Sequence, residues 1–590
     1  MADDLRVMEV LDATVKAHGA EAAMKVKRGG AWQTTSWKEY QAGVRKTARG
    51  FMALGLAPGQ GVAIIGYNCP EWFLADVGAI AAGGVPAGIY TTCTGEQCQY
   101  IADHCDAPIV VAENAQQLAK FLAVRDRLPK VKAYVVMHGE ASGENVHTWA
   151  QLLALADTIS DEQLDARIAA QKLDDTATLI YTSGTTGTPK AVMITHRNIT
   201  WVASQTVKQV DTRPGDRIVS YLPLSHIAEQ VVSLHTPMLI GACTWFAESM
   251  EQLGDNLREI HPNMFLGVPR VWEKIQAKMM AAGAQNSPMK KKIAAWARKK
   301  GLAGGYAEQR GEGKPFLYGL ANKLVFSKVR ERLGLDQCRY LATSAAPISK
   351  DTLEFFLSLG LPVLEIYGMS ECTGPATISL PNKYRTGKAG FALPGAELKI
   401  AEDGEVCMRG KHVFKGYFKD ETATAEAIDK DGWLHSGDIG VIDDDGFLRI
   451  TDRKKDLLIT AGGENVAPQL IEGHLKGIAA ISQAVVVGDR MKYLAALLTL
   501  DPEKIAGAAA TVGSPAKDVD EARACERFNA WLQKEIDRVN GGLARVQTIK
   551  KWVVVKGDFS VDGGELTPTL KIKRKVVREK YKSEIDSLYV

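Results

Sequence analysis

The stretch "YTSGTTGTPKAVMIT", residues 181–195, places five hydroxyl residues and two glycines between positions 182 and 188, followed by a proline, Lys190 and an apolar run. The glycines let the backbone approach a ligand closely, the hydroxyls donate hydrogen bonds, and the lysine adds a positive charge. Such a loop suits phosphate oxygens, although its spacing is not that of the P-loop. The alternative interpretation is a surface loop rich in Ser, Thr and Gly.

Short β-rich segments on both sides of this loop alternate with longer helical patterns. Examples are residues 61–67, 107–113, 131–137, 216–224 and 361–368. The alternation predicts an α/β fold of parallel sheets with crossover helices, in which ligands bind at the carboxyl ends of the strands. From about residue 389 the pattern changes to turn-rich β structure, which predicts a β subdomain. After residue 456, helical segments and a lysine-rich end predict a small α+β domain.

Composition limits the possible classes of protein. A chain of 590 residues is too long for one core, and a net charge of +3 argues against nucleic acid as a partner. The N-terminus has acidic residues where a signal peptide would be basic, and the longest apolar stretch, residues 72–90, is interrupted by Asp76 and by Gly and Pro. That stretch predicts a buried helix running into a strand. Nine cysteines without a C-x-x-C pair predict reduced core thiols and a cytoplasmic location.

The stretch "EIYGMSECTGPATIS", residues 365–379, offers a second set of candidate residues. Glu371 lies in a glycine-flanked loop after an apolar strand, where a carboxylate suits a hard cation such as Mg²⁺. Tyr367, at the end of that strand, suits stacking on a planar base. The alternative interpretation is a solvated loop acid and a core tyrosine.

The stretch "GWLHSGDIGVIDDDGFLRITDRKKD", residues 432–456, offers a third set. The carboxylate of Asp438 can accept hydrogen bonds from a sugar diol, and Arg453, fifteen residues on, can hold ribose or phosphate. The run at 443–446, "DDDG", is more simply a solvated hairpin turn.

Taken together and in this order, these stretches resemble the adenylate-forming superfamily of acyl-CoA synthetases, nonribosomal adenylation domains and beetle luciferases. The resemblance covers most of the chain. It rests on "YTSGTTGTPK" at 181–190, "YGMSE" at 367–371, "SGD" at 436–438, "DRKKD" at 452–456 and "LTPTLKIKR" at 566–574. Five ordered motifs are far more specific than any one of them.

The resemblance implies a role for each matching residue. The loop would hold the β- and γ-phosphates of ATP through Thr182, Ser183, Gly184, Thr185, Thr186, Gly187 and Lys190. Ala345, Ala346, Pro347, Tyr367 and Gly368 would line the adenine, and Ser370 would touch the α-phosphate. Glu371, with Thr182, would bind Mg²⁺. Asp438 and Arg453 would hold the ribose, and Lys571 would bridge the carboxylate and the α-phosphate.

Two positions depart from the family pattern. The usual G-A-P of the adenine motif reads A-A-P at 345–347, and the usual G-K of the last motif reads Leu570-Lys571. Both variants keep the functional side chain, but the loop around Lys571 loses a glycine and should be stiffer.

The resemblance also implies two domains and a two-step reaction. Residues 1–454 would carry the ATP and acyl sites, and residues 455–590 would form a small mobile domain that rotates about Lys455. ATP would activate a carboxylic acid as an acyl-adenylate, which coenzyme A would then capture. The alternatives are a fatty acyl-AMP ligase that loads a carrier protein, and a non-catalytic acyl- or nucleotide-binding protein, which would be expected to lose Lys571, Glu371 or Lys190.

The segments "SYLPLSHIAEQ" at 220–230 and "GVPRVWEKI" at 267–275 resemble long-chain and very-long-chain fatty acyl-CoA synthetases, with the bubblegum subgroup nearest. His226 would shape the acyl pocket or be a satisfied core residue. No aspartate stands near it to meet an amino acid's ammonium, which disfavours that substrate.

Residues 287–301 collect six Lys and Arg around Ile293 and Trp296. Such a helix can lie on an anionic membrane surface as a peripheral contact, or can be a solvated helix that covers the large domain.

Overall fold

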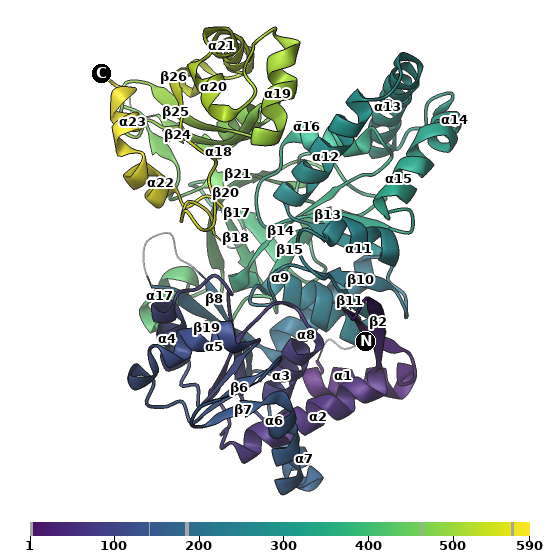
Figure 1. Cartoon of the computed structure of the whole chain (residues 1–590), viewed down its shortest axis with the longest axis vertical. Helices are drawn as coiled ribbons and strands as arrows, with labels where there is room; N and C mark the ends of the chain where they lie inside the picture. Colours follow the sequence, from purple (N-terminus) through teal and green to yellow (C-terminus); the bar gives the residue numbers. More distant parts are fainter. Residues whose placement is uncertain (1–3, 141, 183–187, 462–463, 568–570) are drawn as a thin grey trace.

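The computed structural model describes residues 4–140, 142–182, 188–461, 464–567 and 571–590. In Figure 1 the first third of the chain lies at the bottom, the C-terminal domain at the upper left, and helices α12 and α13 at the upper right. A four-stranded sheet lies between the bottom layers and the C-terminal domain.

An eight-stranded sheet carries the hydroxyl-rich loop. Its order is β19-β9-β8-β4-β3-β5-β6-β7. The strands are β3 (Gly61–Ile65), β4 (Val85–Ile89), β5 (Ile109–Ala112), β6 (Ala133–Val136), β7 (Val146–Thr148), β8 (Thr176–Thr182), β9 (Lys190–Thr195) and β19 (Gly416–Tyr417). The strands β3 to β8 run parallel, as predicted, and β3 to β6 are buried along their whole length because helices cover both faces. The sheet departs from the prediction at one edge, where β9 and β19 run antiparallel.

A nine-stranded sheet faces it, in the order β16-β15-β14-β13-β12-β10-β11-β1-β2. Its strands are β1 (Ala22–Arg28), β2 (Ala31–Ser36), β10 (Arg217–Ser220), β11 (Cys243–Phe246), β12 (Met264–Gly267), β13 (Tyr340–Thr343), β14 (Leu364–Met369), β15 (Gly374–Ile378) and β16 (Phe391–Ala392). The centre is parallel, and β15, β16 and β2 are antiparallel additions.

Helices fill the space between the two large sheets. These are α1 (Val7–His18), α2 (Trp37–Ala53), α3 (Pro70–Ala81) and α8 (His196–Gln209), whose buried side chains share one core with both sheets. The helix α2 begins at a capping box in which Ser36 and Glu39 satisfy each other's backbone N–H groups. The predicted buried helix running into a strand is confirmed as α3 followed by β4.

Other helices cover the outer faces. On the eight-stranded sheet these are α4 (Gly95–His104) and α5 (Ala115–Leu122). On the nine-stranded sheet they are α11 (Leu253–Ile260), α12 (Pro269–Ala284) and α16 (Lys350–Leu357), with Trp272 at the centre of an aromatic cluster.

The predicted β subdomain is confirmed as an antiparallel sheet of β17 (Glu397–Ile400), β18 (Glu405–Arg409), β20 (Leu434–Ile442) and β21 (Leu448–Arg453). The run "DDDG" is the turn between β20 and β21. Asp443 accepts a hydrogen bond from the backbone N–H of Phe447 at 2.8 Å and pairs with Lys388. The hairpin-turn interpretation is therefore confirmed.

The end of the chain forms the predicted α+β unit. The strands β24 (Ile481–Val487), β25 (Leu494–Leu500) and β26 (Ile549–Val554) form a sheet with a separate core on each face. The helices α18 (Pro468–Lys476) and α21 (Glu526–Asn540) pack on one face, and α22 (Arg574–Lys580) packs on the other. The turn at 454–456 connects β21 to this unit, and Lys455 is exposed within it.

All nine cysteines are free; six are buried, as predicted for core thiols, and Cys93, Cys338 and Cys525 are half-buried. None of the described helices is long and apolar enough to cross a membrane.

Candidate active site

The hydroxyl-rich loop connects β8 to β9, so it is the end of an antiparallel hairpin rather than a strand-to-helix turn. Thr182 and Lys190 are paired in register, and the Thr182 hydroxyl donates to the Lys190 carbonyl at 3.4 Å. The predicted phosphate contacts Ser183, Gly184, Thr185, Thr186 and Gly187 lie outside the described residues.

A tyrosine that the sequence did not single out lies between Lys190 and Glu371. The Lys190 ammonium lies 4.8 Å from the centre of the Tyr417 ring, and the Tyr417 hydroxyl donates to Glu371 Oε1 at 2.8 Å. Because Tyr417 belongs to the short strand β19 beside β9, sheet pairing fixes its position next to Lys190.

Glu371 lies in a 3₁₀ turn, Ser370–Cys372, between β14 and β15. Its side chain is buried, so the interpretation as a solvated loop acid is wrong. The backbone N–H of Phe414 donates to the Glu371 carbonyl at 2.9 Å, which holds this turn against the segment that leads to Tyr417. Ser370 is buried beside it.

Tyr367, Asp438 and Arg453 meet although they are far apart in sequence. Asp438 lies within β20, directly opposite Arg453 of β21. Asp438 Oδ1 pairs with Arg453 Nε at 3.2 Å, and its Oδ2 accepts from the Tyr367 hydroxyl at 2.8 Å. Burial raises the pKa of the Asp438 carboxyl, and Arg453 and Tyr367 offset part of that rise.

Lys571 joins this group from the C-terminal unit. Burial and the neighbouring Arg453 lower the pKa of its ammonium to about 8, and the charges of Asp438 and Glu371 oppose that shift. Two hydrogen bonds hold the backbone of Lys571 to Thr567: the Lys571 N–H donates to the Thr567 hydroxyl at 3.0 Å, and the Thr567 N–H donates to the Lys571 carbonyl at 2.8 Å. The structure therefore gathers Glu371, Asp438, Arg453 and Lys571 within electrostatic reach of one another.

His226 caps the short helix α9 (Ile227–Glu229) by accepting the N–H of Ala228 at its Nδ1, at 3.2 Å. Burial and, secondarily, the charge of Lys571 lower the pKa of His226 to about 3, so the ring is neutral. His226 thus faces the same region as Lys571, and its role at an acyl pocket stays a prediction.

The residues matched to an adenine site lie after β13 and at the end of β14. Ala345 and Ala346 are half-buried and Pro347 is exposed. Gly368 is required by sheet pairing, because a Cβ there would lie 1.8 Å from the Gly374 carbonyl oxygen on β15. Ala345 has φ +75°, a left-handed conformation that favours glycine.

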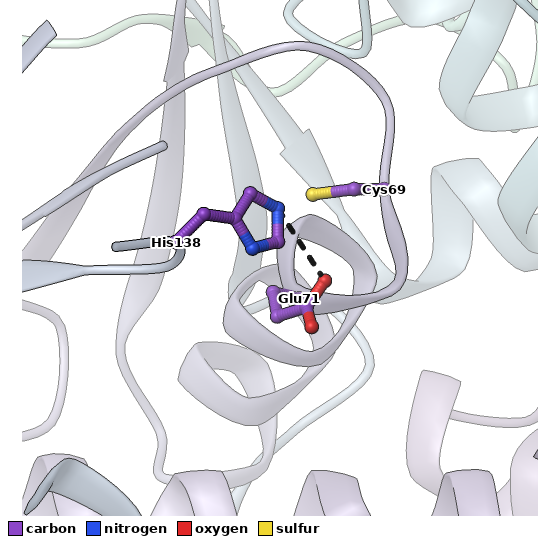
Figure 2. Close-up of side chains that lie close together, drawn as sticks. All are labelled: Cys69, Glu71 and His138. Carbon is purple, nitrogen blue, oxygen red and sulfur yellow. Dashed lines mark ion pairs between the residues drawn. The ribbon is translucent and has the colours of Figure 1, made fainter. Parts of the chain in front are cut away.

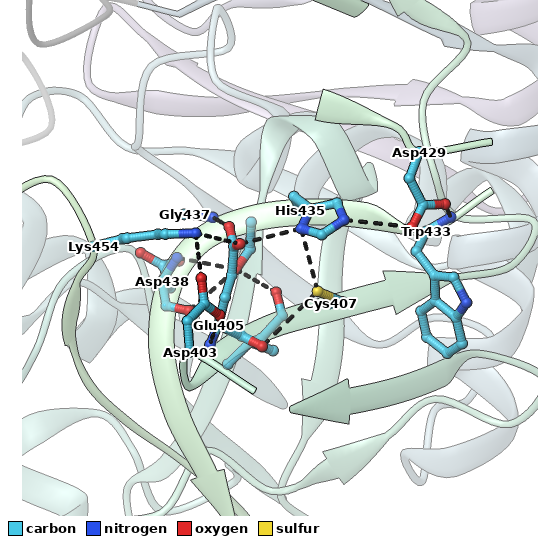
Figure 3. A network of polar contacts seen from close by, with 11 residues as sticks. Asp403, Glu405, Cys407, Asp429, Trp433, His435, Gly437, Asp438 and Lys454 are labelled. Atoms are coloured by element: carbon cyan, nitrogen blue, oxygen red, sulfur yellow. Dashed lines mark hydrogen bonds and ion pairs between the residues drawn. The ribbon is translucent and has the colours of Figure 1, made fainter. Parts of the chain in front are cut away.

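A polar network that includes Glu405, His435 and Lys454 lies next to Asp438 (Figure 3). Glu405 Oε1 accepts the N–H of Gly437 at 2.7 Å, and its Oε2 pairs with Lys454 at 3.0 Å and His435 at 3.1 Å. The Lys454 N–H also donates to the Gly437 carbonyl at 2.8 Å. Glu405 therefore ties together the residues that adjoin Asp438 and Arg453, a positioning role that the sequence gave no motif to reveal.

Two groups of side chains in the described part of the chain have the composition of metal sites. Glu405, Cys407 and His435 form one, but Lys454 already pairs with the carboxylate, and burial raises the pKa of the Cys407 thiol to about 11. Cys69, Glu71 and His138 form the other (Figure 2), where Arg28 pairs with Glu71 at 2.6 Å and burial raises the pKa of the thiol. Both groups are explained by ion pairs within the chain.

The chain matches profiles of a class of enzymes that bind AMP. A family profile described as AMP-binding enzyme matches residues 11–418, and one described as AMP-binding enzyme C-terminal domain matches residues 455–590. The chain belongs to the AMP-binding enzyme family.

Curated relatives are more specific. The long-chain-fatty-acid–CoA ligase ACSBG2 of Xenopus laevis is 44% identical over 99% of this chain and 83% of its own length. Its human counterpart is 40% identical over 99% of this chain and 92% of its own length. The resemblance to the bubblegum subgroup is confirmed by these relatives.

Solved structures share the fold. The adenylation domain of a carboxylate reductase from Mycobacterium chelonae has a TM-score of 0.78 at 21% identity, covering 99% of this chain and 91% of that one. An anthranilate CoA ligase in complex with anthranoyl-AMP has a TM-score of 0.76 at 19% identity, covering 99% of both chains. The predicted α/β fold with a C-terminal domain is confirmed.

The left-handed backbone at Ala345 predicts that Ala345→Gly stabilises the large domain. Relief of the strain outweighs the entropy that glycine costs, for a net gain of about 1 kcal/mol, or roughly 1 °C in Tm. Thermal unfolding of the purified protein measures the change. Ala346→Gly is the matched control. Ala346 lacks a positive φ, so this substitution should destabilise the protein. A lower Tm for Ala345→Gly would contradict the inference that the backbone of Ala345 is strained.

Proposed function

We propose that this protein activates a long-chain fatty acid with ATP and transfers the acyl group to coenzyme A, with release of pyrophosphate and AMP. The carrying observation is that Lys571, from the last motif, lies within electrostatic reach of Glu371, Asp438 and Arg453, from two others. The relatives' printed names support the substrate class.

We assign the nucleotide contacts as follows. Thr182 and Lys190, with the loop between them, hold the β- and γ-phosphates. Ser370 contacts the α-phosphate. Ala345, Ala346, Pro347, Tyr367 and Gly368 border the adenine, and Asp438 and Arg453 hold the ribose. The Tyr367–Asp438 hydrogen bond supports this set, because it joins the two proposed surfaces into one.

In the first step, a carboxylate oxygen of the fatty acid attacks the α-phosphorus, and the bond to the pyrophosphate oxygen breaks. Both reactants are anionic, so the site must supply positive charge and fixed donors rather than covalent help. Lys571 and Lys190 carry that charge in this proposal. Lys571 is already buried away from water. In such a region of low dielectric constant, its charge acts more strongly on a phosphate than it would in water.

The chemistry of Glu371 fits Mg²⁺. It is a buried carboxylate, and among the described residues no cation forms an ion pair with it, while Tyr417 fixes one of its oxygens. Glu371, with Thr182, would hold the ion, and when bound the ion supplies charge neutralisation on the phosphates. The hydrogen bond from Tyr417 orients the carboxylate for that purpose.

In the second step, the thiolate of coenzyme A attacks the acyl carbon and AMP leaves. We propose that residues 455–590 rotate as a domain about Lys455, which withdraws Lys571 and opens the site to the thiol. The exposed turn at 454–456 supports this boundary, because it connects two units that have separate cores.

We also propose that His226 borders the acyl chain. It lies close enough to Lys571 for the charge of that lysine to help lower the pKa of the imidazole. A cytoplasmic location agrees with nine free thiols, and peripheral membrane contact through residues 287–301 would bring the enzyme to its substrate.

Tyr417→Phe should raise the Mg²⁺ concentration needed for half-maximal adenylation on the order of tenfold, because Glu371 loses a hydrogen bond to a charged group. The phenyl ring still lies under Lys190, so the KM for ATP at saturating Mg²⁺ should change little. Metal titration of pyrophosphate release measures the effect. Tyr417→Leu, which also removes the ring, should raise that KM as well. An unchanged Mg²⁺ requirement would contradict the inference that Tyr417 supports metal binding.

The pH dependence of adenylation should report Lys571. Its ammonium loses a proton as the pH rises through about 8, so kcat/KM for ATP should fall above that pH. In Lys571→Arg the guanidinium stays charged, so the remaining activity should not show this fall. A profile that is flat to pH 10 in the wild-type protein would mean that Lys571 is not the group required in its charged form.

The function itself is tested by AMP release from ATP with fatty acids of increasing chain length, with and without coenzyme A. We expect AMP and acyl-CoA to form together with long-chain acids. Lys571→Ala should abolish adenylation yet still convert supplied acyl-adenylate to acyl-CoA, which a misfolded variant would not. Adenylate formed without coenzyme A turnover would indicate a carrier-protein ligase, and no ATP use with any acid would contradict an enzymatic role.

A further inference from the structure

Positive charge is concentrated in one part of the chain. Residues 286–332 contain twelve Lys and Arg but only three Glu, whereas the whole protein has a net charge of only +3. The remaining residues are therefore net negative. The side chains of Lys290, Lys291, Lys292, Lys299, Lys323 and Lys328 form no ion pair with any residue that the structure describes.

Exposed apolar side chains gather in the same part. Phe316 is 83% exposed and Met289 is 73% exposed. Met280 lies just before this part, and Ile293, Leu317, Leu320 and Leu324 lie within it, so residues 280–328 hold half of the large hydrophobic residues that the described surface exposes. Isolated exposed apolar residues are ordinary, but such a concentration marks an interaction site.

Apart from Met280, which lies on α12, these residues belong to elements that pack together. The helix α13 (Pro288–Gln309) lies beside α14 (Tyr318–Ala321) and the π-helical turn η4 (Asn322–Phe326), as Figure 1 shows at the upper right. Ala297, Ala321 and Phe326 form a small core between them. Gly304 permits this approach, because a Cβ there would lie 2.4 Å from the Tyr318 ring.

Apolar and basic residues alternate on the outer surfaces of these elements. In α13, helical spacing puts Met289, Lys292 and Ile293 on one face. In α14 and η4, Leu320, Lys323 and Leu324 share a face in the same way. Phe316 projects from the connecting loop, next to Leu317, whose backbone has φ +68°. We call residues 280–328 the basic-apolar arm.

We propose that the basic-apolar arm docks on an anionic phospholipid membrane, with its lysines at the headgroups and Phe316, Met289, Leu320 and Leu324 inserted at the acyl boundary. Lysines near such a surface gain from its negative potential, and apolar side chains gain from leaving water. Uncompensated charge argues against a protein partner of ordinary composition, because the core of a protein interface is depleted of lysine.

The arm includes residues 287–301 and extends the contact to a second, sequentially separate row of apolar side chains. A fatty acid substrate partitions into the same bilayer, a benefit that rests on the proposed function. Membrane binding itself does not, because it requires no turnover.

The test is sedimentation of the full-length protein with vesicles of phosphatidylcholine, alone or mixed with phosphatidylserine. We expect binding only to the mixed vesicles, weakened by salt. Lys290→Gln, Lys291→Gln and Lys292→Gln together should weaken it on the order of 100-fold, at roughly fivefold per lysine. Phe316→Ser with Leu320→Ser should weaken it roughly tenfold or more.

Matched controls change exposed residues elsewhere. Lys16→Gln, Lys38→Gln and Lys534→Gln remove the same charge, and Met250→Ser with Val441→Ser removes similar apolar surface. Three outcomes would each overturn the proposal. They are equal losses of binding in the test and control variants, equal binding to both vesicle types, and self-association that depends on Phe316 in place of vesicle binding. AMP release from detergent-dispersed fatty acid should be unchanged in all variants; its absence in the wild-type protein would count against the proposed function alone.

Discussion

Burial of the Lys571 ammonium near Arg453 is electrostatically unfavourable, and the carboxylates of Asp438 and Glu371 oppose that cost. Lys571 is buried and the charge of Arg453 lies near it, and these two effects lower the pKa of Lys571 to about 8. Asp438 and Glu371 compensate only in part, and Asp438 is itself paired with Arg453. With Lys190 beside Tyr417 included, three cations stand against two carboxylates, and a triphosphate supplies the anion that would balance this excess.

The acids of the site are held in place by groups that do not themselves belong to any recognisable motif. Tyr417 fixes Glu371, and Glu405 fixes the backbone next to Asp438 through Gly437 and next to Arg453 through Lys454. Glu405 on β18 contacts the neighbouring strand β20, whereas Tyr417 on β19 of the eight-stranded sheet reaches Glu371 in the turn between β14 and β15. An orienting hydrogen bond matters most where the geometry of a bound cation or sugar is demanding.

The sequence predicted the layers and the charged residues but not these supports. Alternation of β-rich and helical segments suffices to predict parallel sheets, and motif order suffices to bring Glu371, Asp438, Arg453 and Lys571 to one site. It could not predict that Asp438 and Arg453 are paired across a ladder, because register depends on the bulge between Ile439 and Gly440. Nor does "KGYFKD" distinguish Tyr417 from any other strand tyrosine. The sequence shows that position 345 is alanine where the family pattern has glycine. The backbone strain at this alanine could be inferred only from its φ angle in the structure.

The contacts that hold Lys571 in place between the two parts of the chain are few in the described structure. Lys476 pairs with Glu273 at 3.2 Å, and Arg270 lies 3.5 Å from Asp558. These four side chains are only 12–23% exposed, so the cost of removing both charges from water offsets much of their attraction and each pair adds little to stability. Removing Lys571 from the site would also return its ammonium to water. The ammonium would then regain the hydration that it lost on burial. Once pyrophosphate has left, the anions that favour the buried lysine are fewer, so the balance shifts toward separation. We therefore infer that the charge of the nucleotide would chiefly stabilise the position of Lys571 that suits adenylation. The loss of that charge would then be sufficient to drive the proposed rotation.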